Sequence, residues 1–194
     1  PRHRSADAGD RPGPLTRLHA KGQIMTRPLA VARTLLLAAA MSTAAHAAGA
    51  ADTTIAPREG WVVIDTEMGF PDLVERTRAA VTDAKMGLVT QASASDGARG
   101  QGLTIPGNRV IGVYRNDHAR RMLAASIAAG IEAPIRFYLT EDADGTATLS
   151  YKTPSFVFAP YSEEGGSDLA ALAEELDGVF AGIAEEATGS PVPR

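Results

Sequence analysis

The feature that most limits what this chain can fold into is an apolar segment close to its start. Arg27 and Arg33 flank the beginning of this segment, three leucines and a run of alanines form its middle, and Ala45-His46-Ala47 ends it. A basic part, an apolar part and a small-x-small site in this order are typical of a cleavable secretory signal peptide. We therefore predict a signal peptide over residues 25–47 that is cleaved after Ala47.

The alternative is a lasting membrane anchor, which needs about 20 strongly apolar residues. The segment falls short because alanine, serine and threonine dominate it after its leucines. We favour cleavage and expect a periplasmic or secreted protein without stable membrane insertion. Residues 1–24 begin without Met and show no apolar period, so we interpret them as an extension upstream of the native start.

Charge limits the partners of the remaining chain. Seven of the 19 basic residues and two of the 23 acidic residues lie at or before Ala47, so residues 48–194 keep 12 and 21, a net charge of −9. A phosphate-binding surface needs a basic stripe, and we therefore exclude nucleic acid as a partner. These 147 residues suffice for one domain that buries about 70% of its unfolded surface.

The chain contains no cysteine, which excludes thiol catalysis, disulfides and covalent haem attachment within it. Three of its four histidines precede the expected cleavage site, and His118 alone follows it. A site built from several imidazoles is therefore excluded, and we predict no cofactor.

The pattern of apolar residues predicts alternating strands and helices after a linker over residues 48–60. We expect a short buried strand at 61–64, a helix from Phe70 to about Gly87 with Asp72 as its cap, a strand at 88–91, and a loop over 92–108 with at most one helical turn. A third strand at 109–114 precedes a helix capped by Asn116 or Asp117 and ending at Gly130. Its expected apolar stripe is Ala119, Met122, Leu123 and Ile127.

The second half contains the clearest hairpin in the sequence. Apolar residues alternate with polar ones on both sides of Asp144-Gly145. A three-residue loop, Ala143-Asp144-Gly145, with a positive φ at Gly145, places the apolar residues of both strands on one face. A two-residue loop would instead place Phe137 opposite Lys152.

A final helix capped by Ser167 shows a continuous apolar stripe from Leu169 to Ile183. The order of elements predicts an α+β domain whose mainly antiparallel sheet is covered on one face by helices. We place this single domain at residues 61–187, with a tail at 188–194.

Several sequence blocks resemble the domain of unknown function 302 family. They are Met86-Gly87-Leu88-Val89, the segment Ile105 to Tyr114, Ala133-Pro134-Ile135-Arg136, Ser150 to Ser155, and Leu176 to Phe180. The resemblance covers about residues 61–187. It implies a compact α+β fold of the TATA-binding-protein-like type and supplies no function, because fold alone does not define activity.

The polar face of the hairpin is the first candidate site. Two cations and a phenol on alternate positions are suited to hold an anionic ligand by charge-assisted hydrogen bonds. The alternative is a solvated face covered by long side chains. The candidate ligand-binding residues are Arg136, Tyr138, Ser150, Tyr151, Lys152 and Ser155.

Three further groupings are weaker. His118 and Met122 lie one helical turn apart and, with Met68 or Met86, would suit a soft metal, but we expect His118 in an exposed first turn and Met122 in the core. Asp65 and Glu67 follow the first strand and would suit acid–base catalysis. The alternative is a solvated or capping role for both side chains. Ser155 lacks the Gly-x-Ser-x-Gly turn of a nucleophile.

We therefore predict a non-catalytic protein that binds a small polar or anionic ligand or a protein partner, with homo-oligomerisation left open. The alternative is a hydrolase-like enzyme that uses the hairpin face and Ser155.

Overall fold

The computed structural model describes residues 55–192. The predicted signal peptide, its cleavage after Ala47 and the upstream extension lie outside the described residues. None of the described helices combines the length and the apolar character needed to cross a bilayer.

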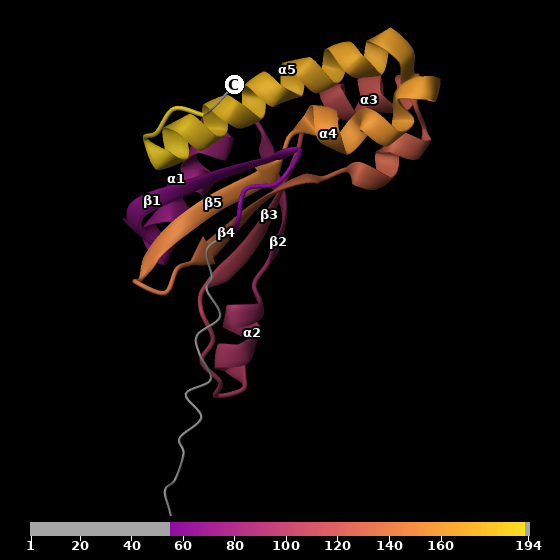
Figure 1. Ribbon diagram of the computed structural model, residues 1–194. Helices are drawn as coiled ribbons and strands as arrows, with labels where there is room; N and C mark the ends of the chain where they lie inside the picture. Colours follow the sequence, from indigo (N-terminus) through magenta and orange to yellow (C-terminus); the bar gives the residue numbers. More distant parts are fainter. Residues whose placement is uncertain (1–54, 193–194) are drawn as a thin grey trace, which may run out of the picture. The chain divides into compact units, whose positions relative to one another are not determined.

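Five strands form one antiparallel sheet in the order β1-β5-β4-β3-β2 (Figure 1). From β2 to β5 each strand pairs with the next one in sequence, whereas β1 crosses the sheet to pair with β5. The strands are β1 (Trp61–Gly69), β2 (Gly87–Ala92), β3 (Asn108–Tyr114), β4 (Ile135–Glu141) and β5 (Thr146–Lys152).

Successive side chains of each strand point to opposite faces of the sheet. The inner face holds the core, and on the opposite face Thr148 and Ser150 of β5 are also buried. Ile111, Phe137 and Leu149 are completely buried on the inner face, where helices α1 (Phe70–Asp83) and α5 (Ser162–Thr188) join the same core. Figure 1 shows α5 running along the sheet beside α1. The expected α+β domain, an antiparallel sheet with packed helices, is confirmed.

The register of the hairpin is as predicted. Phe137 lies opposite Tyr151 and Leu139 opposite Leu149, so the apolar sets share one face. The N–H of Asp142 donates to the carbonyl of Thr146 at 2.8 Å, and Gly145 has φ 88°, which closes the three-residue loop.

The final helix, α5, has a kink close to its predicted start. It spans Ser162–Thr188, but Gly166 is non-helical, with φ 52° and ψ −147°, directly before the expected cap Ser167.

A hydrogen bond also joins the two helices that pack on the sheet. Arg76 of α1 donates from Nε to the carbonyl of Ala187 at 2.7 Å, which ties α1 to the last turn of α5.

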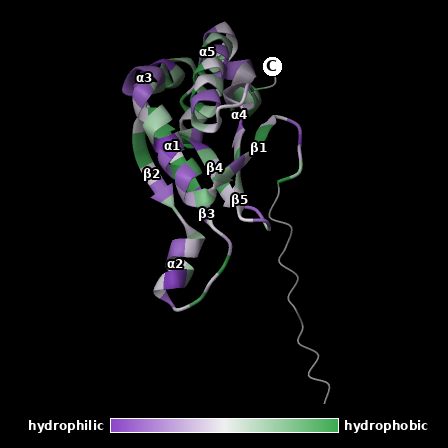
Figure 2. Cartoon of the chain, turned by 90° about the vertical axis from the view of Figure 1, so that its left-hand side faces the viewer, coloured by the Kyte–Doolittle hydropathy of each residue, from purple (hydrophilic) through white to green (hydrophobic). Residues whose placement is uncertain are grey.

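The region expected to be a loop contains a two-turn helix, α2 (Ala94–Gly100). Ser93 caps it by accepting the N–H of Asp96 at 3.0 Å, a local signal that its many small residues obscured. Figures 1 and 2 both show α2 standing beyond the ends of β2 and β3.

The third helix is shorter than predicted. Helix α3 (Asn116–Ala125) ends five residues before Gly130, and a 3-10 turn, η1 (Ala128–Glu132), follows. Ala119 and Met122 are buried as expected, but Leu123 is 46% exposed and Ile127, which lies beyond the end of the helix, is 82% exposed. The N-cap is Arg115, one residue before the expected Asn116 or Asp117, and its side chain makes no capping hydrogen bond.

Two short elements connect the hairpin to the final helix. They are α4 (Pro154–Phe158) and the 3-10 turn η2 (Ala159–Tyr161). The first strand also differs from expectation, since it continues to Gly69 and so includes Asp65 and Glu67, which were predicted to follow it.

Candidate ligand-binding face

The structure brings Arg136, Tyr138 and Lys152 together on the open face of the sheet. Tyr138 lies opposite Ser150, and the same register continued by two residues places Arg136 beside Lys152. Both cationic side chains are exposed. Within the described residues neither forms an ion pair, so their charges are not neutralised there.

An aromatic residue that the sequence analysis did not select completes this group. Because β1 pairs with β5, Trp61 lies opposite Lys152. Lys152 Nζ lies 5.7 Å from the centre of the Trp61 ring, and Arg58 Cζ lies 5.0 Å from it. At these distances the ring attracts both cations.

The turn before β1 holds Trp61 and Arg58 in place. The N–H of Thr153, just after β5, donates to the carbonyl of Gly60 at 2.9 Å. Gly60 has φ 72°, and a Cβ there would lie 2.1 Å from the Phe156 ring. A residue with a side chain would be strained and would clash, so glycine allows the turn to dock on the end of β5.

Trp61, Arg136, Tyr138 and Lys152 border a hollow of about 370 Å³, which we call the cation hollow. Its volume is in the range of ligand-sized pockets. Glu132 also borders it, but its carboxylate accepts the hydroxyl of Tyr161 at 2.8 Å. That hydrogen bond raises the pKa of Tyr161. The lining residues are Trp61, Val110, Glu132, Ile135, Arg136, Tyr138, Tyr151, Lys152 and Val157.

The other three predicted binding residues are placed less favourably for a ligand. Ser150 is completely buried and donates to the carbonyl of Tyr138 at 3.3 Å, so it supports the face from within. Tyr151 is 2% exposed, and its ring packs edge-on against Phe137 in the core, where burial raises the pKa of its phenol. Ser155 lies on α4 and is not among the lining residues of the cation hollow.

A second hollow of about 550 Å³ adjoins the first on the same face. The two share Val110 and Tyr138, which are cross-strand partners. We call it the β2 hollow, and its lining residues are Ala92, Ser93, Ala94, Asn108, Val110 and Tyr138.

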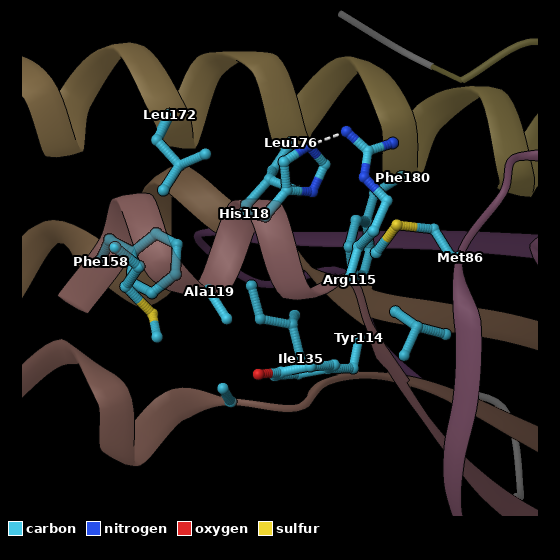
Figure 3. Close-up of a pocket in the computed structure, with 13 residues that line it drawn as sticks. Met86, Tyr114, Arg115, His118, Ala119, Ile135, Phe158, Leu172, Leu176 and Phe180 are labelled. Carbon is cyan, nitrogen blue, oxygen red and sulfur yellow. Dashed lines mark hydrogen bonds between the residues drawn. The ribbon is translucent and has the colours of Figure 1, made fainter. Parts of the chain in front are cut away.

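His118 is buried, not exposed as expected, because α5 packs over the first turn of α3. Its Nε2 lies 3.1 Å from Glu175 Oε1 and also contacts the Arg115 guanidinium (Figure 3). Glu175 accepts a second hydrogen bond from Arg121, and this bond lowers the pKa of Glu175. The other ring nitrogen, Nδ1, is buried without a partner among the described residues.

His118 borders a cavity of about 40 Å³ together with Met122 and Met86. This volume admits a water molecule or two and excludes an organic ligand. In Figure 3 Met86 and Phe158 lie on opposite sides of His118. The part of the chain that the structure describes holds no group of three or more metal-ligating histidine or acidic side chains. His118 and Met122 therefore line the wall of one small cavity.

Asp65 and Glu67, the other candidate pair, are exposed at the far end of the open face. Asp65 accepts the hydroxyl of Thr148 at 3.0 Å, and Asp142 accepts it at 2.7 Å. Asp65, Glu67 and Asp142 line a separate acidic hollow beside the hairpin loop. None of the three lines the cation hollow.

Comparison with known proteins places this fold in a family. A family model described as a domain of unknown function, DUF302, matches residues 62–183. The chain belongs to the DUF302 family. No curated protein matches it. The similarity to the family extends over most of the described residues, as the sequence blocks had indicated.

A solved DUF302 structure has the same fold. It is the crystal structure of an uncharacterized conserved protein DUF302 from Bacillus stearothermophilus, with a TM-score of 0.59 and 16% sequence identity. The match covers 67% of this chain and 99% of that one. At this identity the likeness establishes the fold, and the DUF302 name itself assigns no activity.

Proposed function

We propose that this DUF302 domain binds a small anionic ligand in the cation hollow and does no chemistry on it. The observation that carries the proposal is the pairing of Arg136 with Lys152 on an open face. Two exposed cations without ion-pair partners among the described residues border a ligand-sized hollow, on a chain whose residues 48–194 have a net charge of −9. Concentrating positive charge on an acidic protein favours an anion at this point.

Preformed geometry supports the same site. Trp61 holds Lys152 and Arg58 through its ring, and the docked turn at Gly60 fixes Trp61. The cations are therefore partly ordered before a ligand arrives, which lowers the entropy lost on binding.

The contacts of Ser155 favour binding over hydrolysis. Its hydroxyl lies 3.4 Å from that of Thr153, while its backbone N–H donates to Asp177 at 2.9 Å. His118 instead contacts Glu175 and Arg115. No described contact links the serine to the histidine, which a Ser–His nucleophile requires.

We further propose that the domain acts outside the cytoplasm, in the periplasm or after secretion, on the strength of the signal-peptide pattern at residues 25–47. N-terminal sequencing of exported protein should begin at Ala48. A membrane fraction that retains the leucine segment would contradict this part of the proposal.

Calorimetric titration tests the binding site. Acetate, benzoate, phosphate and citrate are the probes, with wild type compared with the double variant Arg136→Ala and Lys152→Ala. We expect at least one anion to bind wild type, more weakly as ionic strength rises, and to lose about tenfold or more in affinity in the double variant. Both side chains are exposed, so the unfolding midpoint should be retained.

A matched control removes two positive charges at other positions, through Arg120→Ala and Lys85→Gln. Both residues are exposed and neither lines the cation hollow. Equal loss of binding in the control would indicate a general charge effect, and no binding of any probe to wild type would overturn the proposed function.

A further inference from the structure

The open face becomes less charged and more apolar from β5 towards β2. Tyr138 on β4, Val110 on β3 and Ala92 on β2 are successive cross-strand partners. They form a row that leads out of the cation hollow into the β2 hollow, since both hollows share Tyr138 and Val110. A ligand longer than its charged group would therefore follow this row.

Asn108 and Ser93, two polar residues that line the β2 hollow, already form hydrogen bonds within the protein. Asn108 Oδ1 accepts the N–H of Ala94 at 2.8 Å, and Asn108 Nδ2 donates to the carbonyl of Pro106 at 3.2 Å. Ser93 Oγ accepts the N–H of Asp96 and lies 2.9 Å from Ser95 Oγ.

What this hollow offers a ligand is mainly the methyl groups of Ala92 and Ala94, the side chain of Val110 and the Tyr138 ring. A polar group placed there would lose its hydrogen bonds to water without gaining a partner, which weakens binding. An apolar group has no such loss of binding free energy.

The charge near the cation hollow limits the head group. Among the residues that line it, Arg136 and Lys152 are basic and Glu132 is acidic, whereas Arg58, the other cation on the Trp61 ring, is not a lining residue. The balance favours a single negative charge over a polyanion. From β5 to β2 there are three strand spacings, roughly 14 Å, along which a linear tail can lie.

We propose that the ligand is an amphipathic monoanion, a free carboxylic acid with a linear apolar tail. Its carboxylate lies at Arg136 and Lys152, and its tail runs over Val110 to Ala92. This inference rests on the proposed anion binding and adds the chemical class of the ligand.

Titration with straight-chain carboxylates from acetate through hexanoate to decanoate, below micelle-forming concentrations, tests it. Full burial of a methylene is worth about a fourfold change in affinity, and a groove open on one side should give about twofold per methylene. We expect affinity to rise steadily with chain length in wild type. Amide chemical shifts of Val110 and Ala92 should move with decanoate and not with acetate.

The variant Ala92→Asp places a charge at the tail end of the row, at an exposed position that should keep the fold. We expect it to flatten the dependence on chain length while leaving acetate binding within about twofold. The control Gln91→Glu adds the same charge on the same strand, in register with the inner-face residue Ile111, and should behave as wild type.

The outcomes separate the two proposals. Binding that is equal for all chain lengths, yet lost in the Arg136 and Lys152 double variant, would leave the anion site standing and overturn the tail. A chain-length dependence unchanged by Ala92→Asp would place the tail elsewhere and overturn it too. If phosphate binds and no carboxylate does, the anion site stands and the carboxylic acid is overturned. If neither binds, the anion site itself fails. Stronger binding to phosphatidylglycerol vesicles than to decanoate would replace the free acid with a lipid surface.

Discussion

Phe137 on β4 stacks on Phe180 of α5, with ring centroids 4.7 Å apart and planes 20° from parallel. Tyr151 on β5 completes the cluster, 5.2 Å from Phe137 and 5.6 Å from Phe180. All three side chains are at most 2% exposed. The aromatic cluster therefore attaches the final helix to β4, the middle strand of the sheet, and to its neighbour β5.

Replacing Phe180 with Ala should lower the free energy of unfolding by about 3–5 kcal/mol, because it removes a buried ring and leaves a cavity. Urea denaturation measures the change. Ile127→Ala is the control: its side chain is 82% exposed, so we expect a change within about 0.5 kcal/mol. An unchanged unfolding midpoint for Phe180→Ala would show that the ring does not support the core.

Glu175→Ala should destabilise the domain by about 1–3 kcal/mol, because it leaves buried His118 without the carboxylate that its Nε2 contacts. The neighbouring Glu174 is exposed and forms no hydrogen bond or ion pair among the described residues, so Glu174→Ala should stay within about 0.5 kcal/mol. Equal unfolding free energies for the two variants would mean that the contact between α3 and α5 contributes nothing.

Gly112 lies where β3 passes under two side chains. An added Cβ would be 2.1 Å from Thr90 Oγ1 and 2.9 Å from Pro134 Cγ. Gly112→Ala should therefore cost about 1–3 kcal/mol of unfolding free energy. Adding Thr90→Ala should recover part of that loss, since it removes the nearer atom. Strictly additive effects of the two substitutions would contradict the clash with Thr90.

Asp117 should titrate far below the usual range of a carboxyl group. The hydrogen bond from Arg115 lowers the pKa of Asp117 to about 2 from 3.8. Since the folded state binds its proton less readily, the stabilisation is present above about pH 4 and is lost as pH falls towards 2.

NMR titration of the carboxyl carbon of Asp117 measures this pKa directly. The variant Asp117→Asn should lose stability less steeply between about pH 4 and 2. A carboxyl that titrates near 3.8 would contradict the bidentate contact with Arg115.

The hairpin was predictable because its signals are local. Alternation with period two and the φ required of Gly145 together fixed the pairing of Phe137 with Tyr151. The same alternation placed Tyr151 with the apolar residues, which is where the structure has it. Its inclusion among the binding residues did not follow from that pattern.

Only part of the candidate site was predictable from the sequence, because the rest depends on contacts between segments that lie far apart in the chain. Arg136, Tyr138 and Lys152 come from one hairpin, whereas Trp61 joins them only through the pairing of β1 with β5. His118 was expected in an exposed turn for a similar reason. Its burial comes from α5, which begins more than forty residues later in the chain.

The pairing of β1 with β5 also determines when the sheet can be completed during synthesis. Thr66 of β1 donates its hydroxyl to the carbonyl of Ala147 at 2.6 Å, across 81 positions of sequence. Among the described strands β5 is the only neighbour of β1. The first strand to be synthesised must therefore wait for the last, with its backbone hydrogen-bonding groups unpaired. A chain released before Lys152, the last residue of β5, therefore cannot complete its sheet.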